Sequence, residues 1–235
     1  MECRVDQDGP GARMNLVSAT FDWLTDPAHW SGADGITTRL LQHLGYTALT
    51  LLIASAIAIP LGLWIGHTGR FRSLAIGLSS ALRALPTLGV LTLIVLISGI
   101  GLMPPIIALV ILAIPPLLAG SYSGLESVDR NTIDAARAMG MTEGQILRKV
   151  EIPLAAPLLI GGIRSAALQV IATATVAAYV ALGGLGRYLF DGIALRDTPK
   201  MLAGAVLVIV IALVFDALFA AMQKFAVGGR LATVR

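Results

Sequence analysis

Long apolar segments dominate this chain and restrict it to folds in which helices cross a lipid bilayer. A spanning helix needs roughly 20 predominantly apolar residues. Five segments reach or approach that length, namely 44–66, 74–98, 105–122, 157–182 and 201–223. Because a backbone in lipid must satisfy its own hydrogen bonds, such segments fold as helices. The sequence therefore predicts an all-α integral membrane protein with about five transmembrane helices.

The composition agrees with this fold class. Only 13% of the 235 residues are charged and 56% are hydrophobic, whereas soluble domains average about 25% charged residues. Lys and Arg form no run of the kind that binds nucleic acid, so no nucleic-acid partner is expected. A single cysteine, Cys3, excludes an internal disulfide framework.

Two of the five segments are irregular. Segment 74–98 contains Arg83 and Pro86, so a half-helix followed by a second piece is an alternative to one span and would give six elements. The piece 87–98 is too short to span alone. Segment 105–122 is short, and we expect Pro115-Pro116 to break it.

The chain divides into three parts on these criteria. Residues 1–43 form an N-terminal extracytoplasmic arm, irregular up to about Met14, which is also a plausible start, and ending in an interfacial helix with the sequence TTRLLQH. Residues 44–223 form the transmembrane domain and contain a polar loop at 123–156. Lys and Arg are in excess on the side of this loop. We therefore expect the loop and the tail 224–235 in the cytoplasm, with the N-terminus outside.

The polar loop has a helical pattern of its own. Apolar residues recur at helical spacing over 132–139, and Gly140 falls where a helix ends through a left-handed residue. Thr142 and Gln145 have the spacing of a capping box that opens a second helix. Pro153 is expected to stop that second helix.

This loop is either a solvated connector or a docking surface. Ala135, Ala136 and Met139 on a short helix suit a surface onto which another protein packs closely. A loop of about thirty residues with structure of its own is more often functional than not. We therefore favour the docking surface.

The loop resembles the EAA loop of ABC-importer permeases. Asp134-Ala135-Ala136, then Gly140, then Val150-x-Ile152-Pro153 have its spacing, with Asp for Glu, Val for Ile and Ile for Leu. The stretches LRALPTLGVL, GIGLMPP and ATATVAAYVALGGLGRYLFDGI are similar to permeases of osmoprotectant importers, which carry glycine betaine, carnitine, choline or proline. The similarity covers roughly residues 40–225.

The resemblance implies a type I ABC-importer permease fold and a set of partners. These are cytoplasmic ATPase subunits, a second permease copy or homologous permease, and an extracytoplasmic solute-binding protein, all assembled around a subunit in the inner membrane. It also implies an ATPase-coupling role for Asp134, Ala135, Ala136, Met139, Gly140, Ile152 and Pro153.

The sequence offers no site for enzymatic chemistry. It has no G-x-x-x-x-G-K-[ST] phosphate loop, so ATP is expected to bind to a partner subunit and this chain to need no cofactor or metal. The three histidines, His29, His43 and His67, lie near segment ends and are expected to be bystanders.

Charged residues within spans suggest function or pairing. Arg164 and Asp216 lie at similar depths, so we expect an ion pair between segments, the alternative being that each snorkels to the cytoplasm. Arg83, beside Pro86, is expected to face a water-filled inner vestibule.

Segment 157–182 carries a polar face and a small-residue face. Ser165, Gln169 and Thr173 recur every four residues and are expected to line the translocation path, or else to bond helix to helix. The small-residue stripe is expected to pack closely against another helix, with a second permease as a candidate partner; it comprises Ala166, Val170, Ala174 and Ala178. Residues 183–186 form an outer gate or a simple turn.

The solute is not encoded by these features. The resemblance favours compatible solutes such as glycine betaine, choline, carnitine or proline, with another small solute such as methionine as the alternative. A secondary transporter is a further alternative, but it would be expected to show inverted repeats and acidic sites in mid-membrane. Neither is visible in the sequence.

Overall fold

The computed structural model describes residues 10–180 and 183–231, with side chains described over 15–180 and 183–226. These residues form helices joined by short turns and contain no strand. The elements in chain order are α1 (Pro10–Thr25), η1 (Pro27–His29), α2 (Ile36–Thr68), α3 (Arg72–Ala84), α4 (Thr87–Ser98), α5 (Met103–Glu126), α6 (Arg130–Ala138), α7 (Glu143–Ile146), η2 (Leu147–Glu151), α8 (Ile152–Ala177), η3 (Ala178–Val180), α9 (Gly186–Leu195) and α10 (Thr198–Leu231).

Four helical stretches of the described chain are long and apolar enough to cross a membrane. They are α2, α5, the continuous helix 143–180 and residues 198–226 of α10. A fifth span exists only if α3 and α4 count as one, and these two are bent by 88° at their junction. The all-α membrane fold is confirmed, and segment 74–98 follows the alternative of a half-helix and a second piece.

Pro86 explains the bend between α3 and α4. A proline disfavours helical backbone at the residue before it, and Leu85 accordingly adopts an extended conformation with ψ 131°. The chain resumes as a helix directly after Pro86 and ends at Gly99, whose φ is +82°.

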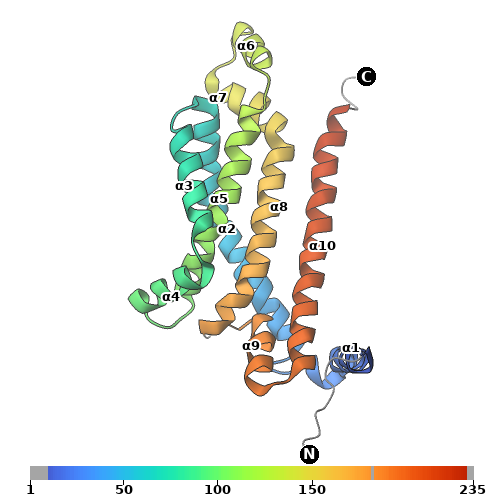
Figure 1. Ribbon diagram of the computed structural model, residues 1–235. Coiled ribbons are helices and arrows are strands. Elements are labelled where there is room, and N and C mark those ends of the chain that lie inside the picture. Colours follow the sequence, from blue (N-terminus) through green and yellow to red (C-terminus); the bar gives the residue numbers. More distant parts are fainter. Residues whose placement is uncertain (1–9, 181–182, 232–235) are drawn as a thin grey trace, which may run out of the picture.

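The long helices run side by side, and their connections gather at two ends (Figure 1). The short helix α6 lies at one end, where the described part of α10 also finishes. Helices α1, α4 and α9 lie toward the opposite end. The two ends of the bundle therefore differ: one carries the polar loop, and the other carries short helices lying across it.

Small residues set the packing of α2, α5 and α8. A Cβ added to Gly62 of α2 would lie 2.5 Å from Cβ of Ser121 on α5. A Cβ added to Gly120 of α5 would lie 2.6 Å from Cα of Gly162 on α8. Backbones approach this closely in membrane proteins through small residues, so these three helices form one packed unit.

The alanine stripe of α8 contributes to the same unit. Its members, which end at Ala178 in η3, are at most 5% exposed; they are Ala166, Val170, Ala174 and Ala178. The first three pack among buried residues of α2 and α5. The expectation that this stripe contacts a second permease is wrong, because the chain's own helices already cover it.

Two expected interruptions are absent. Residues 37–43 do not form a separate interfacial helix but begin the 33-residue helix α2. The 24-residue helix α5 continues through Pro115 and Pro116. Neighbouring helices in a membrane bundle compensate for the hydrogen bonds that an internal proline removes, and both prolines are buried.

The predicted domain boundaries do not coincide with breaks in the chain. The boundary at 43/44 lies within α2 and that at 223/224 within α10, because polar residues that end an apolar stretch are still good helix formers. The loop at 123–156 is irregular only around 127–129 and 139–142. Helix α1 begins at Pro10, so residues 10–14 are helical, while residues 1–9 and 232–235 lie outside the described chain.

Candidate functional site

Helix α6 is capped by a side chain at its start and by backbone hydrogen bonds at its end. At its start, the Asp129 carboxylate accepts a hydrogen bond from the Asn131 N–H at 3.1 Å. At its end, Gly140 has φ +80°, Met141 N–H donates to the Ala136 carbonyl at 3.2 Å, and Gly140 N–H donates to the Arg137 carbonyl at 2.9 Å. This pair of bonds is the Schellman motif. The predicted left-handed glycine is confirmed.

The second helix of the loop starts as predicted but does not stop. The Gln145 side chain accepts a hydrogen bond from Thr142 N–H at 2.9 Å, which caps α7. The helix then passes through a five-residue π-turn, Leu147–Glu151, and continues as α8. A π-turn changes the hydrogen-bond register, and Pro153 then falls in the first turn of α8, where its missing N–H is tolerated. The prediction that Pro153 ends this helix is wrong.

The predicted coupling residues divide into exposed and buried groups. Asp134, Ala135 and Pro153 are exposed, and Met139 is 76% exposed. Ala136 is only 2% exposed and therefore faces the chain itself rather than a partner. The remaining two serve the shape of the loop, because Gly140 makes the turn and Ile152, half-buried, starts α8.

An ion-pair network joins α6 to α7. The Arg137 guanidinium donates to both carboxylate oxygens of Glu143, at 2.8 and 3.2 Å, and to Asp134 at 3.1 Å. The hydrogen bond from Glu143 raises the pKa of Arg137 above its ordinary value. These groups are water-exposed, so the network fixes geometry more than it adds stability.

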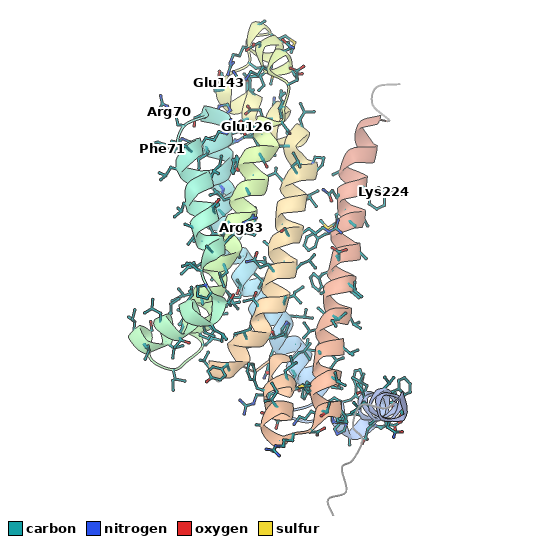
Figure 2. All side chains as sticks on the ribbon, in the orientation of Figure 1. Arg70, Phe71, Arg83, Glu126, Glu143 and Lys224 are labelled. Atoms are coloured by element: carbon teal, nitrogen blue, oxygen red, sulfur yellow. The ribbon has the colours of Figure 1, made fainter. Side chains whose placement is uncertain are left out.

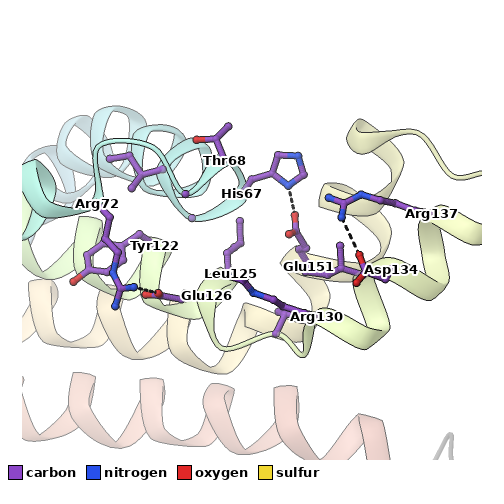
Figure 3. A pocket seen from close by; sticks show the side chains of 15 residues that line it. His67, Thr68, Arg72, Tyr122, Leu125, Glu126, Arg130, Asp134, Arg137 and Glu151 are labelled. Carbon is purple, nitrogen blue, oxygen red and sulfur yellow. Dashed lines mark hydrogen bonds and ion pairs between the residues drawn. The ribbon is translucent and has the colours of Figure 1, made fainter.

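Half-buried His67 and buried Glu151 form a pair that the sequence pattern did not reveal. Glu151 in η2 is 3% exposed, and its Oε2 lies 2.5 Å from Nδ1 of His67 at the end of α2. Figure 3 shows the two side chains facing each other. His67 was expected to be a bystander, and no local periodicity links two residues 84 positions apart.

This pair borders a pocket of about 340 Å³ between the ends of α2 and α5 and the α6 loop. Figure 3 shows its charged lining. Arg72 and Glu126 form a second ion pair across it, at 2.5 Å. The remaining charged residues of the lining are Arg130, Asp134 and Arg137.

At the opposite end, the other two histidines hold the fold together. His43 is buried, with Nε2 3.1 Å from the Ile171 carbonyl of α8, and His29 Nδ1 lies 2.8 Å from the Trp23 carbonyl. Tyr188 of α9 donates to the Asp34 carbonyl at 2.6 Å, and burial raises the pKa of its hydroxyl to about 12.

The glycine turn before α9 is bound to α2. Gly184, at φ +82°, donates its N–H to Gln42 at 3.0 Å. Of the predicted gate or turn at 183–186, this contact supports a fixed turn. The adjoining residues 181–182 lie outside the described chain.

The predicted residues of the membrane interior have different environments. Gln169 donates to the Leu112 carbonyl of α5 at 3.0 Å, so it joins helix to helix. Ser165 is exposed on α8 and Thr173 is half-buried. Arg83 is exposed on α3 (Figure 2) and forms no ion pair with any described residue.

Arg164 and Asp216 are brought together as predicted. Arg164 Nε lies 2.7 Å from Asp216 Oδ1, and its Nη2 lies 2.8 Å from Oδ2. Each side chain is about one-third exposed in the single chain, at 32% and 35%. Among the described residues, no cluster of His, Cys, Asp and Glu is suited to hold a metal ion.

Bundled helices of membrane-spanning length with a structured polar loop at one end define a multi-spanning membrane protein. Residues 58–226 match the family described as "Binding-protein-dependent transport system inner membrane component". The chain belongs to this family of inner-membrane transport permeases.

Curated relatives are similar over most of their length. The carnitine transport permease protein OpuCB of Listeria monocytogenes is 38% identical over 175 residues, covering 74% of this chain and 80% of the relative. The choline transport system permease protein OpuBB of Bacillus subtilis (strain 168) is 31% identical over 186 residues, covering 79% and 86%.

A solved structure has the same fold. The inward-facing MetNI methionine ABC transporter gives a TM-score of 0.74 at 21% identity, covering 86% of this chain and 99% of that chain. At this identity the match shows the fold alone. The expected type I importer permease architecture is therefore confirmed.

Proposed function

We propose that this chain is the permease subunit of an ATP-driven importer for compatible solutes such as glycine betaine, choline, carnitine or proline. The observation that carries the proposal is the 38% and 31% identity to permeases named for carnitine and choline. The methionine transporter shares 21% identity and supports the fold, not the solute.

The importer would contain further subunits. We propose cytoplasmic ATPase subunits that bind the ATP, an extracytoplasmic solute-binding protein, and a second permease that is a copy of this chain or a homologue. Membership of a binding-protein-dependent transport family supports the binding protein. The absence of a phosphate loop from the sequence supports a separate ATPase, and no cofactor is proposed for this chain.

The α6 end would be the ATPase-coupling surface. Asp134, Ala135 and Met139 are exposed there on a helix that is capped at both ends. A small residue beside an exposed methionine lets another protein approach closely and adapt its packing. Ala136 and Gly140 would act indirectly, by fixing the shape of that surface.

Charge distribution supports a cytoplasmic α6 end and an extracytoplasmic N-terminus. Basic residues whose side chains are described and that belong to the α6 end are Arg70, Arg72, Arg130, Arg137, Arg148, Lys149 and Lys224. Fewer belong to the other end, namely Arg39, Arg187, Arg196 and Lys200. Cytoplasmic segments carry the excess of Lys and Arg.

Within the membrane, we propose that Ser165 and Thr173 line the solute path and that Arg83 faces water. Ser165 and Arg83 are exposed in the single chain, so both side chains are free to line a water-filled vestibule between subunits. Gln169 would contribute less, because its amide is engaged with Leu112.

The test is purification of the tagged chain with its partners, followed by uptake of labelled glycine betaine, choline and carnitine. Wild-type chain should recover an ATPase subunit and support uptake. Ala135→Asp should lose both with a normal amount of chain in the membrane, because the charge and bulk face the partner. Lys149→Ala, also exposed on this loop, is the matched control and should retain both. Retention of both by Ala135→Asp would contradict the coupling surface.

A further inference from the structure

We infer that His67 and Glu151 form the link through which movement of the α6 loop reaches α2. They are positioning residues on which the coupling of ATP hydrolysis to solute movement depends. This inference rests on the proposed function, because it assumes that an ATPase acts on the loop.

Glu151 occupies an unusual place for a carboxylate. It is 3% exposed and lies in the π-turn where the polar loop continues into the span α8. A buried carboxylate without a partner is strongly unfavourable. His67, in the last turn of α2, supplies that partner through Nδ1 at 2.5 Å.

The second nitrogen of His67 continues the contact toward the loop surface. Its Nε2 lies 3.5 Å from the Glu143 carboxylate. Glu143 is held by Arg137 at 2.8 Å, and Arg137 is held to Asp134 at 3.1 Å. Polar contacts therefore run without a gap from the exposed face of α6 to the end of α2.

This route is the polar connection of α2 to the loop. Helices α5 and α8 are joined to the loop by the backbone, so they follow its movement directly. Helix α2 has no backbone connection to the loop, so it is tied to the loop by its packing on α5 and by this polar route. In the described chain, no other α2 side chain forms a hydrogen bond or ion pair with residues 127–151.

A displacement of His67 would move α5 as well as α2, because the two helices are closely packed at this point. The preceding residue, Gly66, packs so closely on α5 that an added Cβ would lie 2.8 Å from Cβ of Leu125 and 2.9 Å from the Tyr122 carbonyl. Close-packed helices shift as units rather than deform continuously. A displaced Glu151 would therefore pull the end of α2 along with α5.

The experiment compares three substitutions of His67 in the complete complex, with ATPase and binding protein, in proteoliposomes. His67→Asn places an amide N–H where Nδ1 stood and preserves the bond to Glu151. His67→Gln places its amide nearer the Nε2 position, toward Glu143, and His67→Ala removes both contacts. The readout is solute moved per ATP hydrolysed.

We expect His67→Ala and His67→Gln to lower that ratio roughly 5- to 150-fold, the range of typical coupling free energies, while His67→Asn stays near wild type. ATPase recovery with the chain should be unchanged in all three. A purely structural role would lower the amount of complex and leave the ratio of the surviving complex unaltered. A ratio for His67→Ala within about twofold of wild type, well below that range, would overturn the inference.

His67→Ala leaves Glu151 buried and unpaired, so the variant is at risk of misfolding. The double variant His67→Leu with Glu151→Leu removes both polar groups, which keeps the site packed and the chain folded. It should be recovered in normal amounts with the ATPase, yet show the low ratio, and a normal ratio would overturn the inference. Failure of the proposed function is distinct: wild-type chain would then move solute without ATP or not at all.

Discussion

Arg164 of α8 and Asp216 of α10 form a two-bond ion pair, with Nε–Oδ1 at 2.7 Å and Nη2–Oδ2 at 2.8 Å. Gln223 of α10 adds a hydrogen bond to the Pro157 carbonyl at 2.8 Å. Only 6% of the residues in the most apolar 18-residue stretch of α10 are buried. Polar contacts therefore do much to fix α10 against α8.

The first prediction concerns this pair. Asp216→Ala strands the Arg164 guanidinium within the span, and a charge there is costly without a partner. We expect Asp216→Ala to lower the amount of folded chain more than the double variant Arg164→Ala with Asp216→Ala. Size-exclusion chromatography in detergent measures this directly. Lys224→Ala, exposed on the same helix, should be silent, and additive losses in the double variant would mean that the pair is not formed.

The second prediction concerns helix packing. Gly120→Ala introduces a Cβ 2.6 Å from Cα of Gly162, so α5 and α8 must separate, at a cost of about 1–3 kcal/mol. The melting temperature of the purified chain should fall. Gly45→Ala on α2, where an added Cβ meets nothing within 4 Å, is the matched control and should be neutral or stabilising. Equal melting temperatures for the two variants would contradict the close approach.

The third prediction concerns Gly140. Nothing lies within 4 Å of an added Cβ at this position, so any effect comes from its φ of +80° alone. Gly140→Val should cost roughly 1–3 kcal/mol in backbone strain, misaligning α6 and α7 without affecting insertion of the spans. We expect normal membrane amounts, weak ATPase recovery and little uptake. Gly140→Asn tolerates the left-handed conformation and should recover most function; equal loss in both variants would exclude backbone strain as the cause.

Patterns of neighbouring residues in the sequence correctly predicted those structural features that depend on neighbouring residues. Apolar length located the spans, Gly140 located the end of α6, and Thr142 with Gln145 located the start of α7. The pairing of Arg164 with Asp216 followed from their matching depths. In each case the relevant contacts lie within a few residues or follow from membrane geometry.

Prolines were interpreted less well, because their effect depends on tertiary context. Pro86 separates two helices, whereas Pro115 and Pro116 lie inside α5. Pro153 follows a π-turn and lies in the first turn of α8, where a proline is tolerated. A single-sequence pattern contains the proline but not the neighbours that compensate for it.

Other contacts between residues far apart in the chain could not be predicted from the sequence pattern. Glu151 was one charged residue among several in a polar loop, and nothing local marks it as buried or as facing His67. The alanine stripe was correctly recognised as a packing surface, but periodicity does not say which helix covers it. Ala136 faces inward for the same reason: the burial of one face of α6 depends on residues elsewhere in the chain.

The fourth prediction concerns orientation. In a chain whose Cys3 is replaced by Ser, Ser127→Cys lies at the end of α5 and Ala194→Cys lies in α9, both at exposed positions near opposite ends of the bundle. A membrane-impermeant maleimide should label Ala194→Cys in intact cells and Ser127→Cys only after permeabilisation. Labelling of Ser127→Cys in intact cells would reverse the proposed orientation and remove the loop from the ATPase.

Solute accumulation in proteoliposomes tests the central claim most directly. The complete complex is reconstituted, ATP is trapped on the side of the α6 loop, and labelled solute with its binding protein is supplied on the other side. We predict accumulation of a quaternary ammonium solute or proline only when ATP and the ATPase are both present, and loss of this accumulation with Gly140→Val. Accumulation driven by an ion gradient without ATP, or ATP-driven accumulation unaffected by Gly140→Val, would contradict this claim.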